Sequence, residues 1–538
     1  EQDNNNLLGG ARPLYSFQGM FQLANSAPVF LSLNADPATG QPADAQRYFR
    51  TGTYAGFIQD DWKLTPELTL NLGLRYEYFT PLREKRGRIS NLVFGPNGLA
   101  DARVVVQDEL FQPDRNNWAP RFGFAYNPDW FGRKLVARGG FGLFYNRIPN
   151  VLFSNTRGNP PFFARYSLCC GNAENPFLGG QINYALGADR SPLSYPVNPE
   201  LAVGIDPETG APRDRDVEIR GSEGKLTNGY VYIYSFDLQY SLPAQFVASL
   251  GYQGSAGHKL IRLVNQNYLF TNNPNFFAVY FPRPDVNSNF NAMLLSLSRR
   301  MSNGLQFDVS YRFSKSIDTL SYEGPGGVTN QTFPQDLASE RGPSDFDSTH
   351  YFVFSGLYEL PMFRSQQGLL GKLLGGFQLN GVVTAHTGFP WTPVTGQSVT
   401  TPGGPTLAPT RPIAYFGGAL NDSSDEAFMP PGGNFPGGGR NFFDISTGGP
   451  PGIGRNSFRG PHYFSTDLSI AKQTRLPFVS ETAMLDLRAN MFNVFNQLNL
   501  QPLTFGSDNA RIENDVFFGF APGGMAGRVV EFQARFSF

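Results

Sequence analysis

The chain has 538 residues and a formal net charge of −1, because 43 basic side chains balance 44 acidic ones. This balance offers no positively charged surface for a phosphate backbone, so we expect no nucleic-acid partner. Only 16% of the residues are charged and 14% are aromatic, whereas soluble domains average about 25% charged residues. No run of about 18 apolar residues occurs, so a membrane-spanning form of this chain would have to use β-strands.

Apolar and polar residues alternate over long segments. From residue 68 to residue 78, every second position is leucine or tyrosine, and polar residues, glycine or charges occupy the positions between them. The same period recurs at 230–240 and 305–313. A period of two predicts β-strands with one apolar and one polar face. Soluble β-sandwiches and propellers also alternate, but strands of about 10 to 15 residues exceed their usual 5 or 6 and favour a membrane barrel.

Fourteen segments with this period are predicted as strands. In chain order they are residues 14–24, 51–63, 67–80, 117–128, 134–147, 229–241, 244–263, 288–300, 304–318, 348–361, 375–388, 461–476, 480–496 and 528–538. Short turns alternate with long loops between these strands. The connection 362–374 is longer than the other turns, but it is expected at the same end of the barrel as the short turns. Outer-membrane barrels show this alternation, with turns on the periplasmic side and loops outside. The predicted fold class is therefore all-β, an antiparallel transmembrane β-barrel with long extracellular loops and short periplasmic turns.

Three further features bear on this prediction. Trp62 and Trp130 lie beside short turns, where an interfacial aromatic belt is expected. The Gly- and Pro-rich segment 401–454 is compatible with either disorder or a folded irregular loop. The chain ends VVEFQARFSF, and an apolar strand closing on Phe538 resembles the C-terminal insertion signal that the barrel-assembly machinery reads in bacterial outer-membrane proteins.

Cysteines and the first residues give limited information. The adjacent Cys169 and Cys170 exclude a disulfide framework and a Cys-based zinc site, leaving loop thiols or a strained vicinal bridge. Residues 1–6 are polar and lack an initiating Met or a signal peptide. We therefore expect a processed or incomplete chain.

The segment YAGFIQDDWKLTPELTLNLGLRYEYFTP, residues 54–81, resembles a barrel hairpin of TonB-dependent transporters, especially the Oar-like group. The resemblance continues through the chain in stretches such as NNWAPRFGFAYNP, SRRMSNGLQFDVSYRFSKSID, GGFQLNGVVTAHTGFPWTP and LDLRANMFNVFNQ. It implies a 22-stranded barrel with a plug domain. Residues 1–538 would then be a partial barrel domain of about 14 strands, with the plug, the N-terminal strands and the TonB-contacting segment outside this sequence.

The sequence carries no catalytic signature. No nucleophile elbow, Walker loop, HExxH motif or EF-hand loop occurs, and the neighbouring Asp60 and Asp61 point to opposite faces. We expect no enzyme activity, no catalytic residue and no cofactor. The four histidines all lie near loop ends of predicted strands, but their parity separates them between the two faces, so no metal site is predicted. They are His258, His350, His386 and His462.

Charged residues on the polar faces are expected to line the lumen, because Arg or Lys facing lipid costs about 2 to 4 kcal/mol at mid-membrane. They would form ion pairs and contact the plug, or contact the substrate directly. This set comprises Arg75, Glu77, Arg121, Arg138, Asp237, Asp308, Arg312, Asp467, Asp486, Arg488, Glu531 and Arg535. Extracellular loops offer candidates for ligand binding by aromatic stacking and charged hydrogen bonds: Trp391, Arg440, Arg455 and Arg459.

The leading hypothesis is an outer-membrane TonB-dependent transporter whose loops capture a ligand too large or too scarce for porins. The resemblance implies these partners: outer-membrane lipid, the plug domain and N-terminal strands of the same protein, the TonB complex and the barrel-assembly machinery. One alternative is a passive fourteen-stranded channel, and another is a surface scaffold or adhesin. A siderophore, an oligosaccharide, a peptide and an exported protein all remain open as ligands.

Overall fold

The structure is a computed structural model that describes most of the chain. The described residues are 2–5, 14–17, 19–24, 30–35, 46–162, 164–169, 204–205, 212–213, 218–269, 276, 278–321, 333–363, 365–395, 411–412, 414–415, 443–444, 452–477, 479–480, 482–504, 508–514 and 517–538. Within them, the structure has no helix with the length and apolar character needed to cross a membrane.

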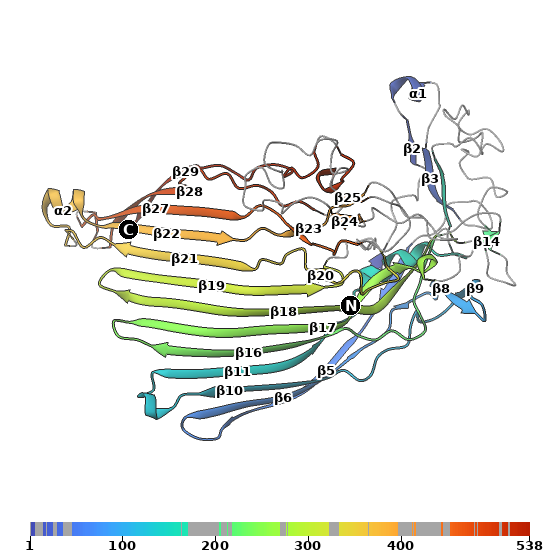
Figure 1. The fold of residues 1–538 in the computed structure, drawn as a ribbon, viewed down its shortest axis with the longest axis horizontal. Helices are drawn as coiled ribbons and strands as arrows, with labels where there is room; N and C mark the ends of the chain where they lie inside the picture. Colours follow the sequence, from blue (N-terminus) through green and yellow to red (C-terminus); the bar gives the residue numbers. More distant parts are fainter. Residues whose placement is uncertain are drawn as a thin grey trace.

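One curved antiparallel sheet dominates the described part of the chain (Figure 1). Thirteen strands follow one another along it, each paired with its neighbours in sequence order. They are β5 (Thr53–Lys63), β6 (Leu68–Phe79), β10 (Trp118–Tyr126), β11 (Leu135–Tyr145), β16 (Tyr230–Ser241), β17 (Phe246–Asn265), β18 (Ala278–Ser302), β19 (Leu305–Asp318), β21 (His350–Glu359), β22 (Phe377–His386), β27 (Tyr463–Arg475), β28 (Met484–Phe492) and β29 (Val529–Ser537).

Shorter elements lie in the connections. The strands are β1 (Gln2–Asn5), β2 (Leu14–Ser16), β3 (Phe30–Ala35), β4 (Arg47–Arg50), β7 (Arg83–Glu84), β8 (Ser90–Gly95), β9 (Gly98–Val106), β12 (Ala164–Cys169), β13 (Gly204–Ile205), β14 (Pro212–Arg213), β15 (Glu218–Arg220), β20 (Gly342–Pro343), β23 (Pro390–Trp391), β24 (Ala414–Tyr415), β25 (Phe443–Asp444) and β26 (Phe458–Arg459). The helices are α1 (Met20–Ala24) and α2 (Gly368–Leu374), with 3-10 turns η1 (Asp129–Phe131), η2 (Asn150–Gly158), η4 (Gln266–Tyr268) and η5 (Asp508–Ala510).

The sheet confirms thirteen of the fourteen predicted strands, and their connections alternate as expected. Short turns gather at one end of the sheet and long connections at the other, on the right of Figure 1. The connection between β21 and β22, which holds α2, lies at the short-turn end. β18 begins ten residues before the predicted start at 288, because its first part pairs with the end of β17 beyond the regular hairpin.

The prediction of a barrel strand at residues 14–24 is wrong. Only β2 is extended there, it pairs with β3 rather than with the main sheet, and the short helix α1 follows. Apolar residues at positions 17, 20, 21 and 24 repeat with helical spacing. A period of 3.6 favours a helix over a long two-sided strand, and this signal is the better guide here.

Strand register gives the sheet two chemically distinct faces. Arg138 lies opposite Asp237, and Asp237 lies opposite Gly251, on the face that also carries Arg75. The other face carries leucine, phenylalanine and tyrosine, as where Leu238 lies opposite Leu250. We call the charged face the lumen face and the apolar face the lipid face, since hydrocarbon accepts only the second.

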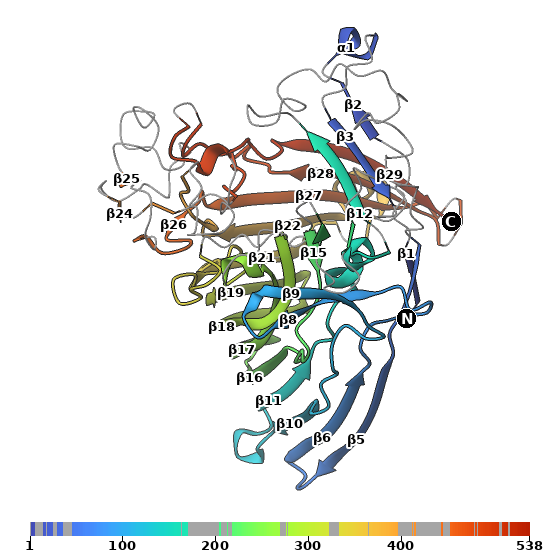
Figure 2. The ribbon, with the colours of Figure 1, turned by 90° about the vertical axis from the view of Figure 1, so that its right-hand side faces the viewer.

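The sheet is open, with β5 and β29 at its two edges. All residues of both edge strands are exposed. β5 and β29 each run from the loop end to the short-turn end, so the two edges run in the same direction. Figure 2, viewed from the loop end, shows the curvature from β29 to β5.

Buried apolar cores lie at the loop end rather than within the sheet. Most side chains of this single-layered sheet are half-exposed or exposed, although small residues such as Ala292 and Ala471 are buried in it. The largest buried side chains lie where loops pack together. Three clusters result. The first is Leu92, Leu99, Ala102, Val104, Ile219, Phe276, Val279 and Phe281; the second is Phe49, Leu82, Ile89, Leu110, Phe111, Ile148, Phe153 and Leu226; the third is Trp391, Val394, Phe443, Leu503, Ala510, Ile512 and Phe518. The described loops are therefore folded parts of the protein.

Candidate functional site at the loop end of the sheet

A buried arginine joins two long loops to the top of β19. The guanidinium of Arg455 donates through Nε to the carbonyl of Glu340 at 2.8 Å, and through Nη2 to the carbonyl of Asp318 at 2.8 Å and to its carboxylate. Nη1 donates to Ser321 Oγ at 3.1 Å and to Asp345 Oδ1 at 3.4 Å. Arg455 therefore links the loop after β19 with the loop before β27.

A second arginine extends this network. Arg411 Nη2 lies 3.2 Å from Glu340 Oε1, and both side chains are buried. Burial lowers the pKa of Arg411, and its attraction to Glu340 opposes that effect, whereas nearby Arg455 adds to it. Within the described residues, Arg411 Nε and Nη1 and Glu340 Oε2 are buried without a hydrogen-bond partner. Among the described residues, the cluster is therefore rich in charge and only partly satisfied by hydrogen bonds.

Asp347 forms the neighbouring polar centre. Its buried carboxylate accepts from Lys315 Nζ at 3.0 Å, from the Ser316 N–H at 2.6 Å and from Arg459 Nη2. Burial opposes the charge of Asp347, but these donors outweigh it and hold the pKa of this carboxyl below its usual range. Arg459 also donates to the Gly388 carbonyl at 3.2 Å, so Asp347 and Arg459 fasten the loop before β27 to the sheet.

This pKa shift predicts an acid-sensitive loop attachment. The folded pKa of Asp347 lies below the unfolded value of about 3.9, so the carboxylate contributes stability above pH ~3.9 that is lost as the pH falls through the lower folded value. We expect residues 452–460 to lose hydrogen-exchange protection, after correction for intrinsic rates, in that acid range. An Asp347→Asn variant should already be less protected at pH 7. An identical acid transition in both proteins would refute the assignment, and Asp508→Asn is the exposed control.

Trp391 lies in the third apolar cluster rather than at the loop surface. It is 2% exposed, and its ring centroid lies 5.8 Å from that of Phe458 and 5.9 Å from that of Phe518. The two-residue strands β23 and β26 bring Trp391 opposite Phe458. In this arrangement the ring stabilises the loop core, and stacking on a ligand would require that core to open. Arg440, the remaining predicted loop residue, lies outside the described residues.

Gly388 lies where two loop segments meet most closely. A Cβ at this position would overlap the carbonyl of Gly460, whose N–H donates to Phe389 O at 2.7 Å. We expect Gly388→Ala to destabilise the pairing of β23 with β26 by about 1–3 kcal/mol, measured by hydrogen exchange of residues 458–460. Gly454→Ala is the matched control because, apart from its chain neighbours, no atom of the described residues lies within 4 Å of the added Cβ. Equal effects of the two substitutions would contradict this expectation.

By register, all twelve residues predicted to line the lumen lie on the lumen face: Arg75, Glu77, Arg121, Arg138, Asp237, Asp308, Arg312, Asp467, Asp486, Arg488, Glu531 and Arg535. Ion pairs join Arg75 to Glu77 at 2.9 Å and Arg488 to Asp486 at 2.7 Å. The guanidinium of Arg312 lies 5.0 Å from the ring centre of Tyr351. These contacts explain how charges are held along the face, and a role in plug or substrate contact stays a prediction.

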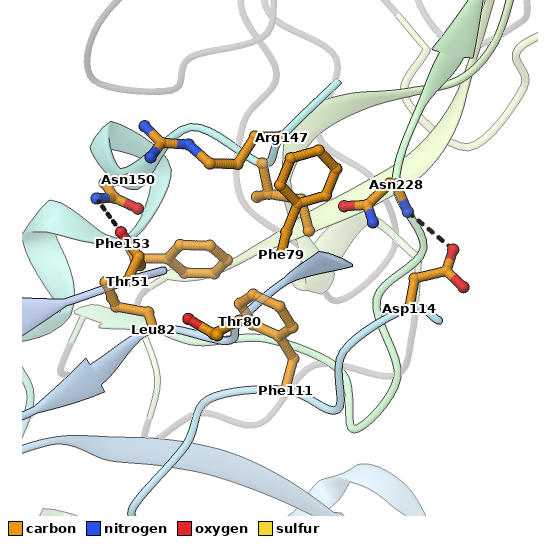
Figure 3. Close-up of a pocket in the computed structure, with 11 residues that line it drawn as sticks. Thr51, Phe79, Thr80, Leu82, Phe111, Asp114, Arg147, Asn150, Phe153 and Asn228 are labelled. Atoms are coloured by element: carbon orange, nitrogen blue, oxygen red, sulfur yellow. Dashed lines mark hydrogen bonds between the residues drawn. The ribbon is translucent and has the colours of Figure 1, made fainter. Parts of the chain in front are cut away.

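A small pocket lies in the second apolar cluster, beside the loop ends of β5 and β6 (Figure 3). Asn150 Nδ2 lies 3.4 Å from Thr51 Oγ1 and the Asn228 N–H lies 3.2 Å from Asp114 Oδ2. The pocket has a volume of about 10 Å³, which accommodates one water molecule. This pocket is therefore a seam between packed loops and is too small for a transported ligand.

Histidines are dispersed in the described sheet. His350 Nδ1 lies 2.7 Å from the Tyr311 hydroxyl, whereas His386 stacks between Tyr351 and Tyr463 on the opposite face. Among the described residues, no group of three or more His, Cys, Asp or Glu side chains is placed to hold a metal ion. Phe538 is exposed and stacks on Phe536, and Cys170 lies outside the described residues.

An antiparallel sheet with an apolar face, a charged face, short turns at one end and folded loops at the other defines the class of bacterial outer-membrane barrels. The chain belongs to the family described as outer membrane beta barrel domain, whose model matches residues 1–520. It is 23% identical over 469 residues to the TonB-dependent transporter Oar of Myxococcus xanthus, covering 82% of this chain and 35% of that protein. The expected resemblance and the outer-membrane location are confirmed, and the family is one of membrane barrels rather than enzymes.

Several solved structures of outer-membrane proteins are similar to this chain at low sequence identity. The match to the ferripyoverdine receptor of Pseudomonas aeruginosa covers 91% of this chain and 39% of that receptor, with 10% sequence identity and a TM-score of 0.41. The match to the siderophore receptor PiuA of Acinetobacter baumannii covers 94% of this chain and 44% of that receptor, with 8% sequence identity and a TM-score of 0.42. The match to the outer membrane transporter YddB of Escherichia coli covers 91% of this chain and 54% of that transporter, with 9% sequence identity and a TM-score of 0.43. This chain spans about a third of its curated relative and about half or less of these receptors.

Proposed function

We propose that this chain is the loop-bearing part of a TonB-dependent outer-membrane transporter that takes up a large or scarce ligand with energy from the inner membrane. The observation that carries the proposal is the open sheet, with thirteen strands along its main path, in a chain similar over 82% of its length to a TonB-dependent transporter. That relative is a TonB-dependent transporter, which supports the proposed activity. The open edges of the sheet indicate that this chain needs further strands.

The strand directions support a larger barrel. An unpaired sheet edge is costly in lipid, so β5 and β29 need partners. Because both edges run in the same direction, antiparallel closure requires an odd number of additional strands. A 22-stranded barrel would require nine. The same argument counts against the passive channel, since the described sheet cannot close on itself in antiparallel fashion.

In the proposed protein, the missing strands, the plug domain and the TonB-contacting segment belong to the same polypeptide outside residues 1–538. The barrel-assembly machinery would insert the barrel by recognising the alternating apolar strand β29. The folded loops would capture ligand, and release from the loops would pass it to a plug held against the charged lumen face. Of the two described arginines predicted to bind ligand, Arg459 is 22% exposed and Arg455 is 6% exposed, so Arg459 is the better candidate for ligand contact.

Conductance and uptake measurements test this function. Full-length protein in planar bilayers should be closed, because a plug occupies the lumen. Wild-type cells should deplete at least one compound from spent medium that a deletion strain leaves, and loss of TonB or of the proton gradient should abolish that depletion. Steady conductance of the purified protein would indicate the passive channel instead. Normal depletion in the deletion strain, with loss of cell–cell contacts, would indicate the adhesin.

A further inference from the structure

An exposed apolar helix projects from the short-turn end of the sheet. The helix α2 lies in the connection between β21 and β22 (Figure 1). Its four leucines are half to three-quarters exposed, and two apolar residues just before the helix extend the patch. The exposed fractions are 77% for Leu369, 66% for Leu370, 55% for Leu373, 49% for Leu374, 55% for Met362 and 50% for Phe363.

The helix is amphipathic with its apolar side facing away from the protein. At about 100° per residue, the four leucines share one side of α2, and Gly371 and Lys372 lie on the other. Gly371 is buried, which places the glycine side against the rest of the chain. A seven-residue helix does not hold itself in water, so contacts with the sheet must fix it.

Those contacts dock α2 on the lipid side of the sheet. Lys472 Nζ donates to the carbonyls of Lys372 at 2.7 Å and Gly375 at 3.1 Å, and so caps the C-terminal end of the helix. Lys472 lies opposite Phe377 on the lipid face, and its ammonium is 4.7 Å from the centre of that ring. Gln366, before the helix, donates to the Gln473 carbonyl at 2.8 Å.

We propose that α2 is an interfacial anchor that lies in the inner leaflet of the outer membrane. Its leucines continue the lipid face, where Leu379 lies between Tyr358 and Ile470 at the same end of the strands. Its basic neighbour Lys472 lies at the level expected for lipid phosphates.

The aromatic residues of other short turns mark the same level. Trp130 is 74% exposed in the turn between β10 and β11, and Trp62 is exposed at the end of β5. Tryptophan is enriched at the membrane–water interface. The leucine side of α2 therefore continues an established lipid surface, and this continuity favours phospholipid over a periplasmic protein or a second copy.

Site-specific fluorescence tests the anchor in the full-length protein. In a Cys169→Ser/Cys170→Ser background, Leu370→Cys is labelled with an environment-sensitive nitrobenzoxadiazole dye and reconstituted in vesicles of phosphatidylethanolamine and phosphatidylglycerol. Lys372→Cys is the matched control, because it lies on the other side of α2 and its substitution leaves the carbonyl that Lys472 binds. We expect doxyl-labelled lipid to quench the dye at position 370 about three-fold more than at 372, and iodide to show the reverse preference.

Two results would overturn the proposal. Equal access of iodide to both positions would place the leucines in water. A dye at position 370 that is protected from iodide and from doxyl lipid alike would place them against protein. Leu373→Cys, on the same side of the helix, provides a second reading if the first variant does not fold, and heat-modifiable electrophoretic migration reports folding of each barrel.

Discussion

Replacing Arg455 with methionine should release the loops that are fastened over the end of β19. The substitution keeps much of the side-chain volume but removes the guanidinium that pairs with Asp318. Within the described part of the chain, the buried carboxylate of Asp318 then keeps only the hydrogen bond from the Ser321 hydroxyl. Removing one partner of a buried ion pair costs about 3–5 kcal/mol, because the other charge stays desolvated and unpaired. We expect residues 452–460 and 333–345 to lose hydrogen-exchange protection, while the strands of the sheet keep theirs.

Two further variants make this expectation specific. Arg83→Met removes an ion pair with Glu109 whose arginine is 65% exposed, so it should leave loop protection unchanged. Arg455→Met combined with Asp318→Leu should recover part of the lost protection, because no buried charge is then left alone. Unchanged protection in the Arg455→Met protein would show that packing alone holds the two loops, and the network would have no structural role.

Trp391→Ala should disrupt the third apolar cluster. The indole packs against Phe458 and Phe518 and is almost fully buried, so its removal leaves a cavity among residues that belong to separate loops. Truncation of a buried Trp costs about 3–5 kcal/mol. We expect faster proteolysis of the loops around residues 390–395 and 508–514 in folded, membrane-inserted protein.

An exposed tryptophan provides the control. Trp130→Ala removes an indole that is 74% exposed at a short turn, and it should not change loop proteolysis. The result would also discriminate between two roles for Trp391. If its function were ligand stacking alone, Trp391→Ala would weaken ligand uptake without accelerating proteolysis, and that outcome would contradict the structural role described above.

The strands were predictable because the side-chain pattern of each strand is local to its own segment. A strand in a membrane barrel must turn apolar residues to lipid and polar residues to the lumen, so the period of two is written into every spanning segment. The segment from Leu68 and the C-terminal strand ending near Phe538 show this directly, and both strands occur where expected. Residues 14–24 fit both a period of two and a helical period, and there the prediction of a barrel strand was wrong.

The loops were less predictable because their contacts join distant parts of the chain. Arg455 and Trp391 were both predicted to be available to a ligand, and the structure buries both of them. Arg455 meets Asp318 across 137 residues, a partnership with no local periodicity. The apolar helix α2 was also missed, because seven residues within a connection are too few for a helical period to stand out.

The sequence by itself determined the class of fold, the two faces of the sheet and the end at which the long loops gather, since lipid and water impose these constraints on each strand separately. Only the tertiary structure decided which loop side chains are buried, how many strands the sheet contains and which way its open edges run. Those properties depend on long-range pairing and packing, which no single segment encodes.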